Sequence, residues 1–188
     1  MNILGLKIEG HDPGAALITS SGVVAIAEER LNRIKHSQGL FPSLAIAYCL
    51  DTFGLKPNEV DLIVIDHTSR KTGSNIRELF YSKTGDAFTN VRLEIISHHE
   101  AHGASAFFCS PFEDAAVLVY DGRGSMLVSE VGVSYIETES LFRGSGNSLS
   151  VIDKTVHTPL KVIGIPQVFG IGMLYDRMCA EYVSFGRH

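Results

Sequence analysis

Short runs of apolar residues separated by polar turns make up the beginning of this 188-residue chain. Three such runs, at residues 2–8, 15–19 and 23–27, follow one another with tight connections and predict an antiparallel meander of strands. A different spacing begins at residue 41, where apolar residues recur at helical intervals as far as residue 53. Gly54 follows directly and is expected to end this helix.

The middle of the chain alternates between continuous apolar runs and helical patterns. Strands are predicted at 61–66, 91–96 and 115–120, and helices around 75–83 and over 98–109. A meander followed by alternating helices and strands is the layout of an α/β protein with crossover connections.

From Ser125 the pattern repeats in outline. Apolar and small residues alternate over 126–135, strands are predicted at 138–144 and 149–157, and a helix at 170–185. In both parts of the chain a strand leads into an acidic residue and a glycine turn. We therefore expect two related halves, 1–114 and 115–188, with a nucleotide cleft between them. The second half has fewer elements than the first, so the chain is expected to be truncated.

The composition provides for a sizeable core, because 45% of the residues are hydrophobic and 20% are charged. The net charge of −5 and the lack of any Lys/Arg run argue against a general binder of nucleic acid or membrane surfaces. No apolar run has the length of a membrane span, and the N-terminus does not resemble a signal peptide. Cys49, Cys109 and Cys179 lie in apolar helical surroundings, which favours buried thiols in a reducing compartment. A cytoplasmic protein is expected.

Three histidines in five positions are the most distinctive chemical feature of the sequence. On the helix predicted at 98–109, His98 and His102 are four residues apart and project from one face, whereas His99 points elsewhere. Asp121 follows at the end of the next strand, before a glycine turn. Two imidazoles and one carboxylate predict a site for one divalent metal, and Fe(II), Mn, Zn and Ni fit this donor set nearly equally.

Two further polar segments lie near the N-terminus. Gly10 and Gly14 free backbone N–H groups that can form a small anion-binding concavity with His11 and Asp12 at its rim, although an ordinary hairpin loop has the same composition. Residues 28–36 are dense in charge, and a solvated helix end is the simplest interpretation of them.

Four segments together carry a resemblance to a known family. They are Gly10 to Leu17 (GHDPGAAL), Val24 to His36 (VAIAEERLNRIKH) followed by Phe41-Pro42, His98 to Ala106 (HHEAHGASA) and Asp121 to Gly124 (DGRG). In this order they resemble the signature of the O-carbamoyltransferase family (NodU/CmcH type) of nodulation and antibiotic-tailoring enzymes.

The resemblance implies an actin-like ATPase (ribonuclease H-like) fold, with the first half complete and the second half partial. It also implies transfer of a carbamoyl group to a hydroxyl of a small molecule or sugar, from a carbamoyl-adenylate made from carbamoyl phosphate and ATP. The family's metal ligands, often to iron, correspond to His98, His102 and Asp121. Its reaction-centre groups correspond to His11, Asp12, Lys35 and His36. The expected nucleotide contacts are the glycine turns, with Gly10, Gly14, Gly122, Arg123 and Gly124.

The sequence departs from the family in two ways. The family's last motif usually reads Asp-Gly-x-Gly-Glu, and Ser125 stands here in place of the glutamate. The family is also far longer, with further nucleotide loops and a YrdC-like domain that makes the carbamoyl-adenylate. We therefore expect this chain alone to be incomplete, with exposed strands that favour a homo-oligomer.

Two other functions remain open at this stage. A tRNA threonylcarbamoyl transferase-like metalloprotein would share the fold and the metal motif, but no basic surface for tRNA is visible in the sequence. A non-catalytic nucleotide-binding or interaction module would keep the fold without turnover.

Overall fold

A five-stranded mixed sheet, in the order β3-β2-β1-β4-β5, forms the frame of the first of two units, Met1–Ile96. Its strands are β1 (Ile3–Lys7), β2 (Gly14–Thr19), β3 (Gly22–Ala27), β4 (Leu62–His67) and β5 (Arg92–Ser97). The first three strands pair antiparallel, as the sequence predicts, and β1 pairs parallel with β4. The coordinates are a computed structural model that describes residues 1–8, 10–67, 73–122, 124–128, 134–157 and 170–182.

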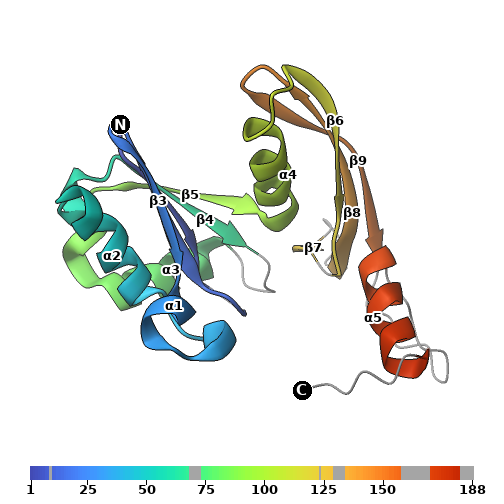
Figure 1. The fold of residues 1–188 in the computed structure, drawn as a ribbon, viewed down its shortest axis with the longest axis horizontal. Helices are drawn as coiled ribbons and strands as arrows, with labels where there is room; N and C mark the ends of the chain where they lie inside the picture. Colours follow the sequence, from blue (N-terminus) through green and yellow to red (C-terminus); the bar gives the residue numbers. More distant parts are fainter. Residues whose placement is uncertain (9, 68–72, 123, 129–133, 158–169, 183–188) are drawn as a thin grey trace. The chain divides into compact units, whose positions relative to one another are not determined.

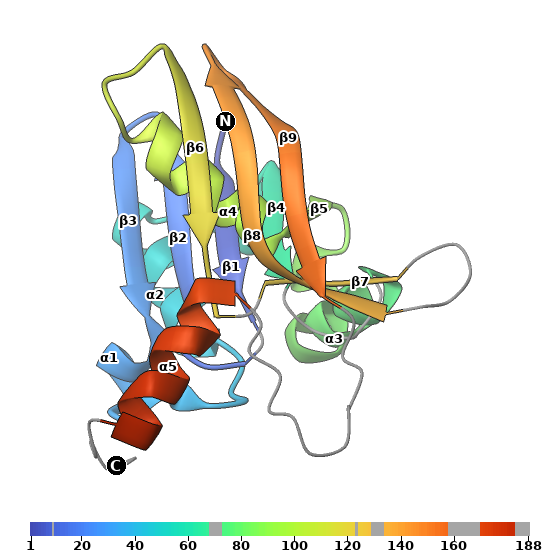
Figure 2. The same cartoon turned by 90° about the vertical axis from the view of Figure 1, so that its right-hand side faces the viewer.

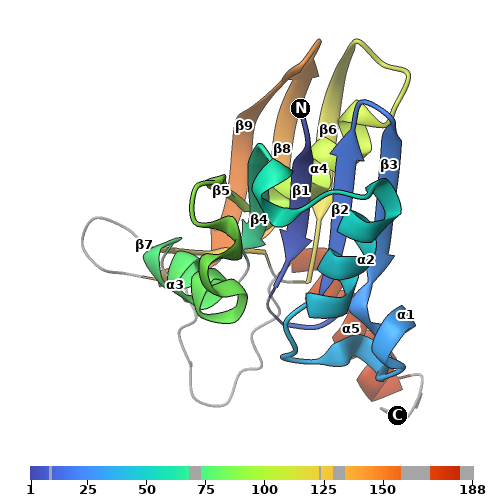
Figure 3. The same ribbon diagram turned by 90° about the vertical axis from the view of Figure 1, so that its left-hand side faces the viewer.

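Two helices, α2 (Ser43–Phe53) and α3 (Gly73–Thr84), supply the side chains that pack against this sheet. Every second residue of β1 is buried, so Leu4 and Leu6 share one face of the sheet. Figure 3 shows α2 alongside the meander, and its buried residues join the same core. The short helices η2 (Pro57–Glu59) and η3 (Gly85–Phe88) lie in the connections.

A buried carboxylate links the charged segment after β3 to α2. Pro42 occupies the N-cap of α2 and makes no side-chain hydrogen bond to the helix. The carboxylate of Glu28, which is only 3% exposed, accepts hydrogen bonds from the backbone N–H groups of Leu44 (3.2 Å) and Ala45 (2.8 Å). It satisfies two of the free N–H groups at the first turn of α2. The prediction of a solvated helix end is therefore wrong for Glu28, the first residue of α1 (Glu28–Asn32).

The second unit, Ser97–His188, contains a four-stranded antiparallel sheet. Its elements are α4 (His98–Phe108), β6 (Asp114–Tyr120), β7 (Met126–Val128), β8 (Ser134–Ser145), β9 (Ser148–His157) and α5 (Gly170–Tyr182). Strand β8 pairs with β6 and β7 along one edge and with β9 along the other. Figure 2 shows β8 between β6 and β9. The predicted run 126–135 is divided between β7 and the start of β8, and residues 129–133 and 183–185 lie outside the described part of the chain.

Helix α4 packs on the sheet of the second unit (Figure 1). Phe107 and Phe142 are buried in a small core with Val117 and Val119. A side chain at Gly144 of β8 would overlap the ring of Phe107, so this glycine lets the helix approach the strand closely. Because of this packing, α4 groups with the second unit. The boundary between pseudo-repeated halves at residues 114 and 115 stays a prediction.

All three cysteines are free thiols. Cys49 is buried in the first core, as expected, but Cys109 at the end of α4 is exposed, so the prediction of buried thiols is wrong there. None of the described helices is long and apolar enough to cross a lipid bilayer.

The role of Glu28 gives a first prediction. Glu28→Ala leaves two N–H groups of α2 without their acceptor, so the free energy of unfolding should fall by about 1–3 kcal/mol. Urea denaturation of the purified chain measures this difference. Glu78→Ala removes an exposed carboxylate from α3 and serves as the control, with a change within about 0.5 kcal/mol. Equal stability of the two variants would show that Glu28 does not cap α2.

Candidate functional site

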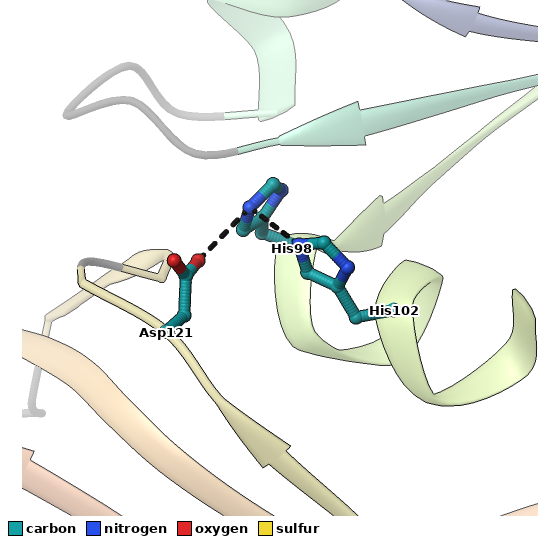
Figure 4. Close-up of side chains that lie close together, drawn as sticks. All are labelled: His98, His102 and Asp121. Carbon is teal, nitrogen blue, oxygen red and sulfur yellow. Dashed lines mark hydrogen bonds and ion pairs between the residues drawn. The ribbon is translucent and has the colours of Figure 1, made fainter. Parts of the chain in front are cut away.

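Two histidines of α4 and the carboxylate after β6 converge on one point in the second unit. His98 Nε2 lies 3.0 Å from His102 Nε2 and 3.1 Å from the Oδ2 of Asp121. All three residues offer ligand atoms within 4.8 Å of one another. Figure 4 shows the ring of His98 between the other two side chains. The structure thus brings together all three residues that the sequence predicts as metal ligands.

The charges of this cluster are arranged to favour a cation. The hydrogen bond from His98 lowers the pKa of Asp121 to about 2, with a further contribution from the N–H of Gly122, although partial burial acts in the opposite direction. Asp121 is therefore ionised at neutral pH. A single proton on His98 Nε2 cannot be shared fully with both the carboxylate and His102, whereas one divalent cation could be bound by all three atoms.

Local sequence explains why α4 begins at His98. Ser97 and Glu100 form a capping box: the Ser97 hydroxyl accepts from the N–H of Glu100 (3.2 Å), and the Glu100 carboxylate accepts from the N–H of Ser97 (2.9 Å). The N–H of His98 donates to the hydroxyl of Ser125 at 3.0 Å. This last bond fixes the start of the helix to the turn that carries Asp121.

Ser125 is supported by a buried carboxylate, that of Glu137. Glu137 is fully buried; it accepts from the N–H of Ser125 at 3.0 Å and forms an ion pair with Lys154. The resemblance noted in the sequence implies a glutamate at the position of Ser125. A carboxylate from the neighbouring strand β8 therefore contacts the backbone at that position.

His99 is packed inside the second unit. Its Nδ1 lies 2.7 Å from the Ser140 hydroxyl, and the ring has no exposed surface. Burial lowers the pKa of His99, so the ring is neutral. A Cβ atom at Gly124 would overlap His99 Nε2, so the absence of a side chain at Gly124 makes room for this ring. As the sequence indicates, His99 does not join the His98 cluster.

A second polar cluster occupies the first unit, at the turn after β1. The carboxylate of Asp12 bonds His11 Nδ1 through one oxygen (2.7 Å) and His36 Nδ1 through the other (2.9 Å). The hydrogen bonds from His11 and from His36, in that order, lower the pKa of Asp12. The side chains of His11 and His36 are 67% and 55% exposed, so a ligand can reach both rings.

The backbone around this cluster adopts an unfavourable conformation. Asp12, Arg33, His36 and Ser37 all have positive φ, which costs non-glycine residues about 1–3 kcal/mol each. Two backbone hydrogen bonds, from Asp12 N to His36 O (2.8 Å) and from Gly39 N to Gly10 O (2.9 Å), join the turn to residues 33–39. The N–H of His36 also donates to Glu29 at 2.8 Å. Such strained positions cluster at functional sites.

The remaining predicted residues have mixed placements. Lys35 is exposed in the short helix η1 (Lys35–Ser37), next to the cluster in sequence. Gly10 and Gly122 have open space where a Cβ would be, whereas Gly14 and Gly124 pack against β3 and His99 respectively. Arg123 lies outside the described residues. The role of these glycines in binding a nucleotide stays a prediction.

Sequence reasoning did not identify Glu29 and Glu137, which support the two clusters through contacts with His36 and Ser125 on other elements. It also missed the contacts of Glu28 with α2 and of Ser140 with His99. Among the supporting residues, Ser97 and Glu100 alone carry a local sequence signal. Their spacing before a helical pattern is that of a capping box.

The described architecture has counterparts among solved structures. YeaZ from Pseudomonas aeruginosa matches with a TM-score of 0.51 and 16% sequence identity, covering 89% of this chain and 73% of that one. A crystal structure of an uncharacterised protein with similarity to the peptidase YeaZ from Pseudomonas aeruginosa also gives 0.51, with 15% identity over 88% and 70% of the two chains. The chain is thus an α/β protein with the actin-like ATPase fold.

Sequence comparisons link the chain to carbamoyltransferases. Residues 2–91 match the family model described as carbamoyltransferase N-terminus. The nodulation protein NolNO of Sinorhizobium fredii is 33% identical over 197 residues, and an uncharacterised protein of Synechocystis is 32% identical over 210 residues. The alignments cover 94% and 93% of this chain, but the chain spans only 26% and 31% of the length of these relatives.

Two neighbouring glycines, Gly122 and Gly124, provide a matched test of the packing next to the cluster of His98, His102 and Asp121. Gly124→Ala forces the Cβ against His99 and Glu137, so the free energy of unfolding should fall by about 1–3 kcal/mol. Gly122→Ala places its Cβ in open space and should change stability by less than about 0.5 kcal/mol. Thermal unfolding of both variants makes the comparison. A destabilisation by Gly122→Ala as large as that by Gly124→Ala would contradict the described packing.

Proposed function

We propose that this chain is part of an O-carbamoyltransferase that moves a carbamoyl group from carbamoyl-adenylate to a hydroxyl of a small molecule or sugar. The adenylate would be made from carbamoyl phosphate and ATP. The observation that carries the proposal is the His98, His102 and Asp121 cluster within a chain that matches the carbamoyltransferase N-terminus model. The three free thiols support a reducing, cytoplasmic location.

The donor set of the cluster fits a divalent metal, with Fe(II) as the first candidate and Mn, Zn or Ni as alternatives. Two imidazole nitrogens and one ionised carboxylate are a common ligand combination for these ions, and none of the three atoms needs to move far to share one ion. When bound, such an ion supplies a Lewis acid that stabilises negative charge on phosphoryl or carbonyl oxygens. His98 and His102 would hold it from α4, and Asp121 from the end of β6.

The residues of the first unit supply proton transfer. In the proposed reaction the acceptor oxygen forms a bond to the carbamoyl carbon, the bond from that carbon to the adenylate oxygen breaks, and AMP leaves. The proton of the acceptor hydroxyl goes to the Nε2 of His11, whose Nδ1 is held by Asp12. Lys35, a cation beside this cluster in sequence, would neutralise the phosphate of the departing AMP.

The metal assignment predicts a loss of affinity at three positions. Alanine at His98, His102 or Asp121 should each lower the affinity for Fe(II) or Mn(II) by at least about tenfold, equivalent to about 1.4 kcal/mol. Titration calorimetry under anaerobic conditions measures the affinity directly. His11→Ala, a histidine of the other unit, should bind as the parent chain does. Unchanged metal affinity in His98→Ala would refute the site.

The proposed reaction predicts that Lys35 is essential. In the protein made from its full reading frame, Lys35→Met should abolish carbamoyl transfer while the circular dichroism spectrum stays the same. The product is detected by mass spectrometry of a hydroxylated acceptor incubated with carbamoyl phosphate, ATP and Fe(II). Lys83→Met removes an exposed charge from α3 and should retain activity. Near-native turnover in Lys35→Met would make Lys35 only a surface charge, and no product from the unmodified protein would contradict the proposed function.

A further inference from the structure

We propose that Asp12 holds His11 and His36 as a pair of oriented bases, and that Glu29 is the positioning residue that keeps His36 in this arrangement. The inference rests on the proposed function only for the role of the two histidines as proton acceptors in carbamoyl transfer. The arrangement itself rests on contacts within the first unit. Neither the family resemblance nor the sequence pattern assigned a role to Glu29.

The first step concerns the protons on the two rings. An ionised carboxylate only accepts hydrogen bonds, so a ring nitrogen bonded to it must carry a proton. Asp12 bonds the Nδ1 of both His11 and His36, one through each oxygen. Each neutral ring therefore has its proton on Nδ1 and a free lone pair on Nε2. The cluster presents two proton acceptors, each held from behind by the same carboxylate.

The second step concerns how His36 is held. Its backbone has φ 60° and ψ −10°, a left-handed conformation inside the short helix η1. Glu29 accepts a hydrogen bond from the N–H of His36 at 2.8 Å, and the carbonyl of His36 accepts from the N–H of Asp12 at 2.8 Å. The peptide groups on both sides of His36 are therefore fixed. Removing the acceptor at Glu29 frees the N–H and lets the backbone leave the strained conformation.

The group of Asp12, Glu29 and His36 does not need a bound cation to explain its geometry. Asp12, Glu29 and His36 offer ligand atoms within 4.8 Å of one another, as a metal site would. Both oxygens of Asp12 and the Nδ1 of His36 are already used in the bonds to the rings, and Glu29 receives the N–H of His36 and lies 3.6 Å from the Nε of Arg30. Internal hydrogen bonds thus account for these groups, and a cation would have to break several of them.

Nitrogen NMR of the chain labelled with ¹⁵N-histidine tests the proposal, because ring nitrogen shifts report the tautomer. At a pH where the rings are neutral, His11 and His36 should both show the proton on Nδ1 in the parent chain. In Glu29→Ala, His36 should lose this preference and show the signals of a free imidazole, while His11 keeps its own. Glu29→Gln retains an oxygen acceptor and should restore the parent signals. Glu78→Ala, which removes an exposed charge elsewhere, should change neither ring.

A second variant tests the shared carboxylate. Asp12→Asn has a single acceptor oxygen, so only one of the two rings can keep its Nδ1 proton bonded there. This measurement stays informative even if Glu29→Ala fails to fold. Parent-like signals for both rings in Asp12→Asn, or for His36 in a folded Glu29→Ala, would overturn the proposal. Binding of Mn(II) that broadens His36 in the His98→Ala chain and is lost in Glu29→Gln would also overturn it, in favour of a cation site.

Activity measurements separate this inference from the proposed function. In the protein made from its full reading frame, Glu29→Ala should lower kcat for carbamoyl transfer at least tenfold with little change in KM, and Glu29→Gln should stay within threefold of the parent. An equal loss of kcat in both variants would mean that the negative charge of Glu29 matters and its hydrogen bond to His36 does not. This result would refute the proposal. If the parent protein shows no transfer but the NMR results are as expected, the positioning role stands and the proposed function fails.

Discussion

The hydrogen bond from His98 N–H to Ser125 Oγ is the contact on which the cluster of His98, His102 and Asp121 depends. It ties the first residue of α4 to the turn after β6, and these two elements carry the three converging side chains. Ser125 is in turn fixed through its own N–H by the buried carboxylate of Glu137. Because Glu137 is paired with Lys154, the charge needed for this support is compensated inside the unit. The geometry of the cluster is therefore set by a chain of polar contacts that runs from α4 to β9.

The two units differ in sheet topology but place polar residues at a similar point. Each contains three antiparallel strands, β1-β2-β3 in the first and β6-β8-β9 in the second, and Asp12 and Asp121 both follow the first of these strands. In the first unit the turn after β1 carries His11 and Asp12, and His36 joins them from η1. In the second unit one carboxylate meets two rings from a helix. In each unit the end of the first of these strands is thus available to carry functional groups.

Much of the fold could be predicted because short-range patterns decide it. The period-two burial of β1 and the positive φ of Gly54 after α2 follow from local sequence, and the actin-like fold followed from the resemblance. The pairing of His98 with His102 also follows from helix geometry. What the sequence did not reveal depends on contacts across the chain. Glu28 was predicted to lie on a solvated helix end, because its contact with the start of α2, where Pro42 provides no side-chain cap, joins residues far apart in the sequence. The run 126–135 likewise contains no local signal for its division between β7 and β8.

The short distance along the chain between His98, His102 and Asp121 has a consequence for how the second unit folds. The three side chains come from α4 and the end of β6, so the loop to be closed between them is small and its entropic cost is low. The pairing of β8 with β9 and the docking of α5 involve later parts of the chain. During synthesis the three side chains leave the ribosome before most of the sheet that supports them. An ion at the proposed site would therefore be able to organise the unit at an early stage of its folding.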